Sequence, residues 1–192
     1  MIRVIITDDH PVVRAGMKQV LSESGDIRVV AETGSGEALI KQIQISDYDV
    51  VLLDITMPGI GGLETLKRLT ALKPELPVLM LSIHTEEQFA LRTLKAGAAG
   101  YLTKESAPDE LVKAIRQVVG GRKYISPHFA EKLAAELDQD IRRLPHERLS
   151  DRELQVLCMI ASGKTVSGIA SELNISVKTV STYRTRLTEK MG

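Results

Sequence analysis

The chain has 192 residues, of which 43% are hydrophobic and 26% are charged. This balance is typical of a globular protein and is enough for one large domain or two of moderate size. The single cysteine permits no internal disulfide, which suits a reducing cytoplasm, so we expect a cytoplasmic protein. No apolar run reaches the roughly 18 residues of a membrane span, and no charged-then-apolar leader is visible, so the sequence predicts neither membrane insertion nor secretion.

Charge is unevenly distributed along a chain whose formal net charge is zero. Residues 1–121 contain 13 Lys and Arg against 16 Asp and Glu, a net charge of −3. Residues 122–192 contain 12 against 9, a net charge of +3. An acidic first part and a basic second part indicate two tasks, with a polyanion as a candidate partner of the second.

The first part alternates strand-like and helix-like segments five times. The expected strands are 3–7, 27–33, 50–54, 78–82 and 100–103, and the expected helices are 11–23, 37–45, a segment after Gly61-Gly62 up to 73, 86–96 and 108–119. The unbroken apolar run 50–53 is typical of a strand covered on both faces, as in parallel sheets. Five such units predict an α/β fold with a doubly wound, five-stranded parallel sheet, in the flavodoxin-like strand order 2-1-3-4-5.

Polar side chains follow several of these strands at their carboxyl ends, where ligands bind in open parallel sheets. The first strand leads into Asp8 and Asp9, the third ends at Asp54, the fourth at Ser82, and the fifth leads to Lys104. Three converging carboxylates resist simultaneous ionisation unless a cation joins them, and an oxygen-only cluster suits Mg²⁺. Lys104 and Ser82 suit phosphoryl oxygens, and an aspartate in this setting can act as a nucleophile. Each residue alone has a plainer interpretation as a helix cap or a surface charge.

Together these motifs resemble the receiver domain of bacterial two-component response regulators, over residues 1–121. The residues that carry the resemblance are Asp8-Asp9-His10-Pro11, Asp54 before Met57-Pro58-Gly59, Ser82, Tyr101 and Thr103-Lys104. The resemblance implies that Asp54 accepts a phosphoryl group from a sensor histidine kinase, and that Ser82 and Lys104 contact the phosphoryl oxygens. It implies that Tyr101 is an aromatic whose burial changes with activation. It also implies a Mg²⁺ site formed by Asp8, Asp9, Asp54 and the backbone carbonyl of Thr56.

Three further residues beside these motifs have open roles. Ile83 stands where the family commonly has a small residue, and its bulk can narrow access to the phosphoryl site. His84 lies where such receivers tune dephosphorylation, and simple packing is an equal alternative. Imidazole is a poor ligand for Mg²⁺, so we expect His10 to shape the turn into the helix that Pro11 starts.

Residues 122–148 are expected to form a helix and a linker, and residues 149–192 a helix-turn-helix domain. Ser126-Pro127 opens a helix to about residue 137, and the polar segment 138–147 follows it. Ser150 and Glu153 have capping-box spacing ahead of a helix to about residue 162. Two further helices are expected at 166–173 and 177–191, joined by a tight turn, with Cys158 in the core.

This second part resembles the LuxR-type DNA-binding domain that is joined to a receiver in response regulators of the NarL/FixJ type. The matching residues are Leu149-Ser150-Asp151-Arg152-Glu153, Val156-Leu157, Gly163, Ile169-Ala170, Leu173, Ile175-Ser176, Thr179-Val180 and Lys190-Met191-Gly192. The resemblance implies that Ser181, Thr182 and Thr185 face base edges, whereas Lys178, Arg184 and Arg186 lie nearer phosphates. A solvated basic face is the alternative for the last helix alone. Family members usually continue into another helix that aids dimerisation, so this domain is expected to lack its last helix.

We interpret the chain as a transcription factor, not an enzyme, in which phosphorylation of Asp54 switches dimerisation and DNA binding. One alternative is an aspartyl-phosphate phosphohydrolase, but Asp54-Ile55-Thr56 lacks a second carboxylate two residues after the first, and no cap domain is visible. The other alternative is a receiver that is never phosphorylated and serves only as an interaction module, which the complete acidic set opposes.

Overall fold

The computed structural model describes residues 1–83, 86–127, 129–131 and 149–191. They fall into two compact units, the first containing the described residues up to 131 and the second those from 149 onward. His84, most of the helix expected after Ser126-Pro127, and the polar segment 138–147 lie outside the described residues. Within the described part of the chain, no helix is both long enough and apolar enough to cross a membrane.

The first unit is built on a five-stranded parallel sheet. Its strands are β1 (Ile2–Thr7), β2 (Ile27–Thr33), β3 (Val50–Asp54), β4 (Val78–Ser82) and β5 (Gly100–Thr103). They lie in the order β2-β1-β3-β4-β5, so the predicted flavodoxin-like order is confirmed. Thr7 pairs with Leu53 and Ser82 with Thr103, so the carboxyl ends of the central strands meet at one edge of the sheet.

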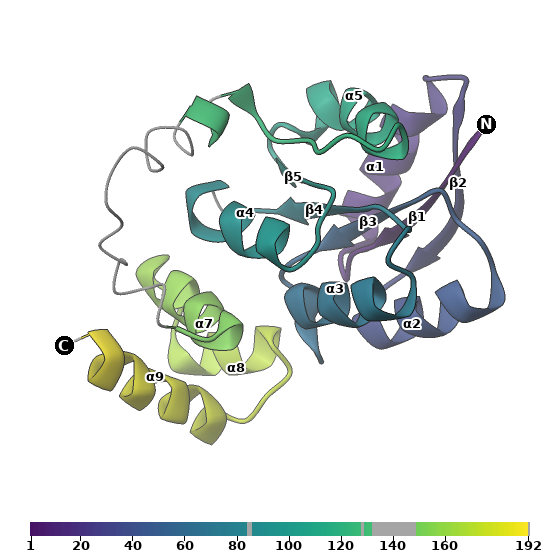
Figure 1. Ribbon diagram of the computed structural model, residues 1–192. Helices are drawn as coiled ribbons and strands as arrows, with labels where there is room; N and C mark the ends of the chain where they lie inside the picture. Colours follow the sequence, from purple (N-terminus) through teal and green to yellow (C-terminus); the bar gives the residue numbers. More distant parts are fainter. Residues whose placement is uncertain (84–85, 128, 132–148, 192) are drawn as a thin grey trace. The chain divides into compact units, whose positions relative to one another are not determined.

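Five helices cover the sheet on both faces. They are α1 (Pro11–Ser22), α2 (Gly36–Ile45), α3 (Gly61–Leu72), α4 (Glu86–Lys95) and α5 (Ala107–Val119). Figure 1 shows α1 and α5 on one face of the sheet, and α2, α3 and α4 on the other. Most boundaries lie within one residue of those predicted from the sequence, which is the usual uncertainty at frayed helix ends.

Burial of the central strand explains why the sheet is covered twice. The four residues from Val50 to Leu53 are all fully buried. Val50 and Leu52 belong to the core that α1 and α5 close, together with Met17, Leu21, Leu111 and Ile115. Side chains alternate along a strand, so Val51 and Leu53 point to the other face. Each buried aliphatic side chain stabilises the fold by about 2 kcal/mol, which makes β3 a firm support for the aspartate at its end.

The second unit contains three helices: α7 (Asp151–Ala161), α8 (Val166–Glu172) and α9 (Val177–Met191). The predicted capping box at the start of α7 is confirmed. The Ser150 amide donates to Glu153 Oε2 at 2.7 Å, and the Glu153 amide donates to Ser150 Oγ at 3.3 Å. Gly163 ends this segment with φ at +80°, and Asn174 has φ at +51° in the turn before α9. The buried side chains include Leu154, Cys158, Met159, Ile169, Leu173, Val180 and Leu187.

Candidate functional site

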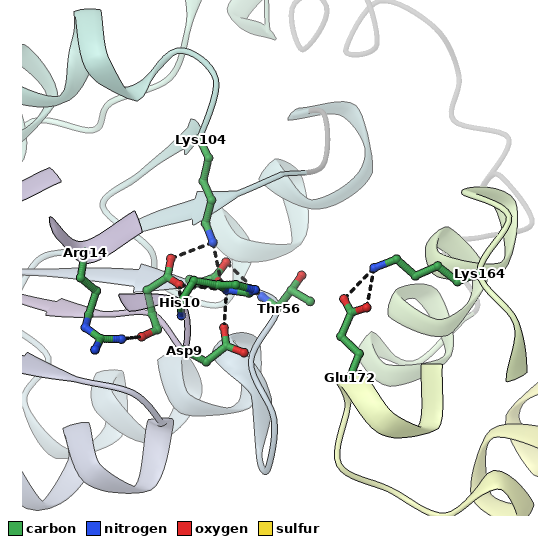
Figure 2. A network of polar contacts seen from close by, with 9 residues as sticks. Asp9, His10, Arg14, Thr56, Lys104, Lys164 and Glu172 are labelled. Atoms are coloured by element: carbon green, nitrogen blue, oxygen red, sulfur yellow. Dashed lines mark hydrogen bonds and ion pairs between the residues drawn. The ribbon is translucent and has the colours of Figure 1, made fainter. Parts of the chain in front are cut away.

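Two buried carboxylates and one lysine meet at the carboxyl edge of the sheet. Asp8 follows β1 and Asp54 ends the neighbouring strand β3, and neither side chain has more than 1% of its surface exposed. Lys104 follows β5, and its Nζ lies 2.7 Å from Asp8 Oδ2 and 2.9 Å from Asp54 Oδ2. Figure 2 shows Lys104 pointing into the cluster that also contains Asp9, His10 and Thr56. A single cation therefore bridges two strand ends that the sequence separates by 46 residues.

The buried position changes the protonation behaviour of this cluster. Burial raises the pKa of Asp54 to about 7; the charge of Lys104 opposes this rise, and the charge of Asp8 adds to it. Burial alone lowers the pKa of Lys104, but the two carboxylates outweigh that effect and leave its pKa above the ordinary value. Asp54 is thus a carboxylate that needs positive charge nearby to stay ionised.

Asp9 and His10 extend the cluster towards solvent. The His10 amide donates to Asp8 Oδ1 at 2.8 Å, and this bond holds the turn into α1, where His10 is the N-cap residue. The His10 ring also joins the two carboxylates, since its Nδ1 lies 2.9 Å from Asp9 Oδ1 and 3.3 Å from Asp8 Oδ1. One ligand atom from each of Asp8, Asp9, His10 and Asp54 can be chosen so that all lie within 4.8 Å of one another. This grouping is compact enough for one divalent cation.

The carboxylate oxygens of this cluster have few other partners. Among the described residues, the enclosed oxygens Asp8 Oδ2 and Asp54 Oδ2 have the Lys104 ammonium as their one close polar neighbour, and Asp9 Oδ1 has the His10 ring. Asp54 Oδ1 accepts a hydrogen bond from the Thr56 amide at 3.2 Å, which places Thr56 directly beside the carboxylate. Such a set of under-coordinated carboxylate oxygens fits a hard cation that prefers oxygen ligands.

The remaining predicted residues of the first unit lie on β4 and β5. Ser82 is fully buried at the end of β4, and its carbonyl accepts a hydrogen bond from the Lys104 amide at 2.7 Å. Tyr101 is fully buried on β5, and its amide donates to the Tyr124 carbonyl at 3.1 Å. The side chain of Ile83 is 64% exposed, so its bulk extends into solvent.

Sequence reasoning missed two residues that support the cluster. Arg14 on α1 donates from Nη1 to the Asp8 carbonyl at 2.6 Å (Figure 2). Gly62 packs so closely that a Cβ there would overlap the carbonyl oxygen of Asp54. The one sequence signal for this close packing was the Gly61-Gly62 pair, because glycine often occurs where two backbone segments approach closely.

All six residues predicted to contact DNA lie exposed on α9. At about 100° per residue, the hydroxyl residues and Lys178 share the face opposite the buried Val180 and Leu187, while Arg184 and Arg186 flank that face on opposite sides. The hydroxyls of Ser181, Thr182 and Thr185 donate to carbonyls four residues earlier, at 3.0, 3.0 and 3.3 Å. A hydroxyl whose proton is already engaged can still accept a hydrogen bond or contact a methyl group.

The far end of α9 is fastened to the start of α7. Lys190 Nζ lies 2.6 Å from Glu153 Oε2, whose side chain is only 3% exposed. Burial by itself raises the pKa of Glu153, but the hydrogen bonds from Lys190 and Ser150 together lower it to about 2. The capping carboxylate thus also fixes the orientation of the exposed helix, a role that the capping-box spacing did not reveal.

Comparison with family models matches both units. Residues 4–116 match the response regulator receiver domain, and residues 147–192 match bacterial regulatory proteins of the luxR family. The chain belongs to the response regulator family. The receiver match spans the cluster of Asp8, Asp9, Asp54 and Lys104, and the luxR match spans α7, α8 and α9.

Several relatives of this response regulator align over its whole length. It is 41% identical to response regulator UvrY of Escherichia coli K12 and 42% identical to response regulator GacA of Pseudomonas aeruginosa. Both alignments cover 100% of this chain, and they cover 88% and 90% of the relatives. Among solved structures, RcsB of Salmonella enterica serovar Typhimurium, bound to promoter DNA with the phosphomimetic BeF₃⁻, matches with a TM-score of 0.69 at 30% identity, covering 100% of this chain and 92% of that one. These likenesses confirm a response regulator of the NarL/FixJ type, with a receiver followed by a helix-turn-helix domain.

Proposed function

We propose that this response regulator is switched by phosphorylation of Asp54, by a sensor histidine kinase, and then regulates transcription through α9. The observation that carries the proposal is the buried Asp54 carboxylate, which lies beside Asp8 and 2.9 Å from the Lys104 ammonium. A nucleophile in this position has a positive charge ready for the oxygens of an incoming phosphoryl group.

In the proposed transfer, an Asp54 carboxylate oxygen attacks the phosphorus of a phosphohistidine. The bond from phosphorus to the imidazole nitrogen breaks, and an acyl phosphate forms on Asp54. The Lys104 ammonium, which contacts the carboxylate before the transfer, can contact the new phosphoryl oxygens after it. The Ser82 hydroxyl, at the end of β4, is the donor that we propose from that strand. The Thr56 amide keeps the other carboxylate oxygen in place during the attack.

A Mg²⁺ ion fits the residues at this site. Asp8, Asp9 and Asp54, with the backbone carbonyl of Thr56, would hold the ion through oxygen atoms. Among the described residues, the enclosed oxygens of these carboxylates have only the Lys104 ammonium or the His10 ring beside them, which leaves them lone pairs for a cation. When bound, it supplies positive charge that offsets the repulsion between the carboxylates and the phosphoryl group. The raised pKa of Asp54 supports this assignment, because it stays at about 7 even beside Lys104, and a further positive charge would favour the ionised carboxylate.

Phosphorylation is proposed to change the surface around β4 and β5. Ser82 and the buried Tyr101 lie on these paired strands, so a shift at Ser82 is transmitted through one ladder to Tyr101. Such a two-state change would favour a homodimer and release the second unit for two half-sites on double-stranded DNA. The exposed basic residues of α9 would contact phosphates and its short polar residues base edges.

We further propose that the chain is not an enzyme and works in the bacterial cytoplasm, where its DNA partner is found. The competing activity is an aspartyl-phosphate phosphohydrolase. That chemistry needs an acid/base carboxylate two residues after the nucleophile, and position 56 is a threonine whose amide, at 3.2 Å, binds Asp54 instead. A steady-state assay with a small phosphate ester separates the two, since a phosphohydrolase should release phosphate from the ester continuously and a response regulator should release none.

Incubation with acetyl phosphate and Mg²⁺, followed by intact-protein mass spectrometry, tests the phosphoryl acceptor. The wild type should gain one phosphoryl group, held as an acyl phosphate that both acid and base hydrolyse. Asp54→Asn should gain none because the amide removes the nucleophile, and Asp9→Ala should be strongly impaired through weaker metal binding. Labelling of Asp54→Asn with an unchanged yield would refute the assignment of the acceptor. Sequencing the DNA fragments that the phosphorylated full-length protein retains would then identify its operators.

A further inference from the structure

We propose that Arg14 is a positioning residue for the metal-binding turn, holding the peptide that joins Asp8 to Asp9. Arg14 Nη1 donates to the Asp8 carbonyl oxygen at 2.6 Å, and its Nε donates to Glu32 Oε2 at 3.3 Å. The Arg14 side chain is only 19% exposed. One planar guanidinium thus links the end of β1 to β2 through α1, as a fork that a single ammonium cannot reproduce. The inference rests on the proposed Mg²⁺ site.

Glu32 is a fixed anchor for this clamp. It lies on β2, and its second oxygen, Oε1, accepts a hydrogen bond from Lys18 Nζ at 2.6 Å. The hydrogen bonds from Lys18 and Arg14 outweigh partial burial and hold the pKa of the Glu32 carboxyl below its ordinary value. Glu32 is therefore charged at neutral pH, and Lys18 fixes it without touching the Asp8–Asp9 turn.

Asp9 depends on its backbone for its position. Its side chain is 24% exposed, and the one ionic contact that it makes within the described part of the chain is with the His10 ring at 2.9 Å. Asp8 is held further by its amide, which donates to the Thr33 carbonyl at 3.2 Å, and by the His10 amide. The Asp8 carbonyl belongs to the same rigid peptide unit as the Asp9 amide. Arg14 therefore fixes the orientation of the peptide group between Asp8 and Asp9, and with it the direction in which the Asp9 side chain leaves the backbone.

The plainer alternative is that Arg14 and Glu32 form a surface ion pair, which contributes little to the stability of the fold and nothing to metal affinity. The two interpretations differ in what they predict for metal affinity. A surface pair affects stability slightly and leaves the carboxylates in place. A residue that orients metal ligands typically changes metal affinity when it is replaced, because the ligands must then be ordered during binding.

Isothermal titration of the full chain with Mg²⁺ tests the proposal. Arg14→Met keeps an unbranched apolar side chain in place of the aliphatic stem but removes both hydrogen bonds, and it should weaken Mg²⁺ binding by roughly 10-fold. Arg14→Lys should lie between Arg14→Met and the wild type, because its ammonium can donate to the Asp8 carbonyl without also binding Glu32. Arg116→Met is the matched control: it also removes a guanidinium with two hydrogen bonds, both to Asp26. Asp26 precedes β2, at the opposite edge of the parallel sheet from Asp8, so this variant should bind Mg²⁺ like the wild type. Thermal unfolding of each variant, without metal, reports any general loss of stability.

Two results would overturn the proposal: Mg²⁺ affinities of Arg14→Met and the wild type that agree, or equal losses in Arg14→Met and Arg116→Met. If Arg14→Met does not fold, Glu32→Gln takes its place. Glu32→Gln leaves the hydrogen bond from Arg14 to the Asp8 carbonyl intact but weakens the contact that anchors Arg14 on β2. A loss of Mg²⁺ affinity of about 3-fold would therefore support the clamp, and an unchanged affinity would contradict it. The proposed function is judged separately, by the wild type alone. A wild-type chain that binds no Mg²⁺ would refute the metal site, whereas a wild type that binds with all variants alike refutes only the role of Arg14.

Discussion

Replacing Glu153 by Gln should loosen the second unit while leaving its helix cap largely intact. The carboxamide oxygen can still accept the hydrogen bond from the Ser150 amide, so the substitution mainly removes the charge that Lys190 contacts at 2.6 Å. The pKa of Glu153 lies at about 2 against an ordinary value of 4.5. A difference of that size corresponds to about 3 kcal/mol of folding free energy. Because the Lys190 side chain is 39% exposed and therefore screened by water, we expect a loss of about 2 kcal/mol.

The assay is a urea titration of the full chain, followed by the NMR methyl resonances of Val180 and Leu187. Both side chains are buried in the second unit, so they report its unfolding independently of the receiver. The matched control is Glu172→Gln, whose ion pair with Lys164 has a similar length, 2.5 Å, but is about one-third exposed on both sides. It should cost no more than about 0.5 kcal/mol.

The dependence on pH gives a second check on the same contact. Since the folded-state pKa of Glu153 is lowered, its stabilisation is complete above about pH 4.5 and is lost as the pH falls towards 2. The stability difference between wild type and Glu153→Gln should therefore shrink to less than half between about pH 5 and pH 3. Equal losses in Glu153→Gln and Glu172→Gln, or a difference that does not change with pH, would refute the reasoning from a buried ion pair.

Three other predictions address the receiver and the recognition helix. The folded-state pKa of Asp54 is raised to about 7, so without metal its charge destabilises the receiver increasingly as the pH rises from about 4 to 7. Asp54→Asn should remove this pH dependence of the unfolding free energy, which amounts to at most about 4 kcal/mol, as measured by urea titrations at pH 5 and pH 8. Gly62→Ala should destabilise the receiver by about 3 kcal/mol and slow labelling by acetyl phosphate, because its Cβ displaces the Asp54 carbonyl, and unchanged stability and labelling would contradict that packing. Arg184→Ala should reduce the slope of log affinity against log salt concentration by about one, for all DNA sequences alike. Thr182→Ala should instead reduce the preference for one base at a single position of the site, by about 1 kcal/mol of binding free energy. Equal salt slopes for the wild type and Arg184→Ala would show that Arg184 does not contact a phosphate.

Local sequence was sufficient for the elements and for the residue types of the site. The unbroken apolar run of β3 predicted a strand buried on both faces, and the glycine, proline and capping signals placed most helix ends within one residue. These features depend on neighbouring residues, and backbone preferences and side-chain periodicity act over the same short range. The convergence of Asp8 and Asp54 followed from the predicted strand order, because parallel strands deliver their ends to one edge.

Contacts between residues far apart in the chain were decided by the tertiary structure alone. No spacing rule connects Arg14 to the Asp8 carbonyl, Gly62 to the Asp54 carbonyl, or Lys190 to Glu153 across 37 residues. The pKa of Asp54 likewise depends on how completely the sheet and loops exclude water, and on the distance to Lys104, which packing determines. Periodicity predicts which face of a segment is buried, and capping signals predict where a helix begins or ends. Which side chains contact that face is determined only by the packing of the elements against one another.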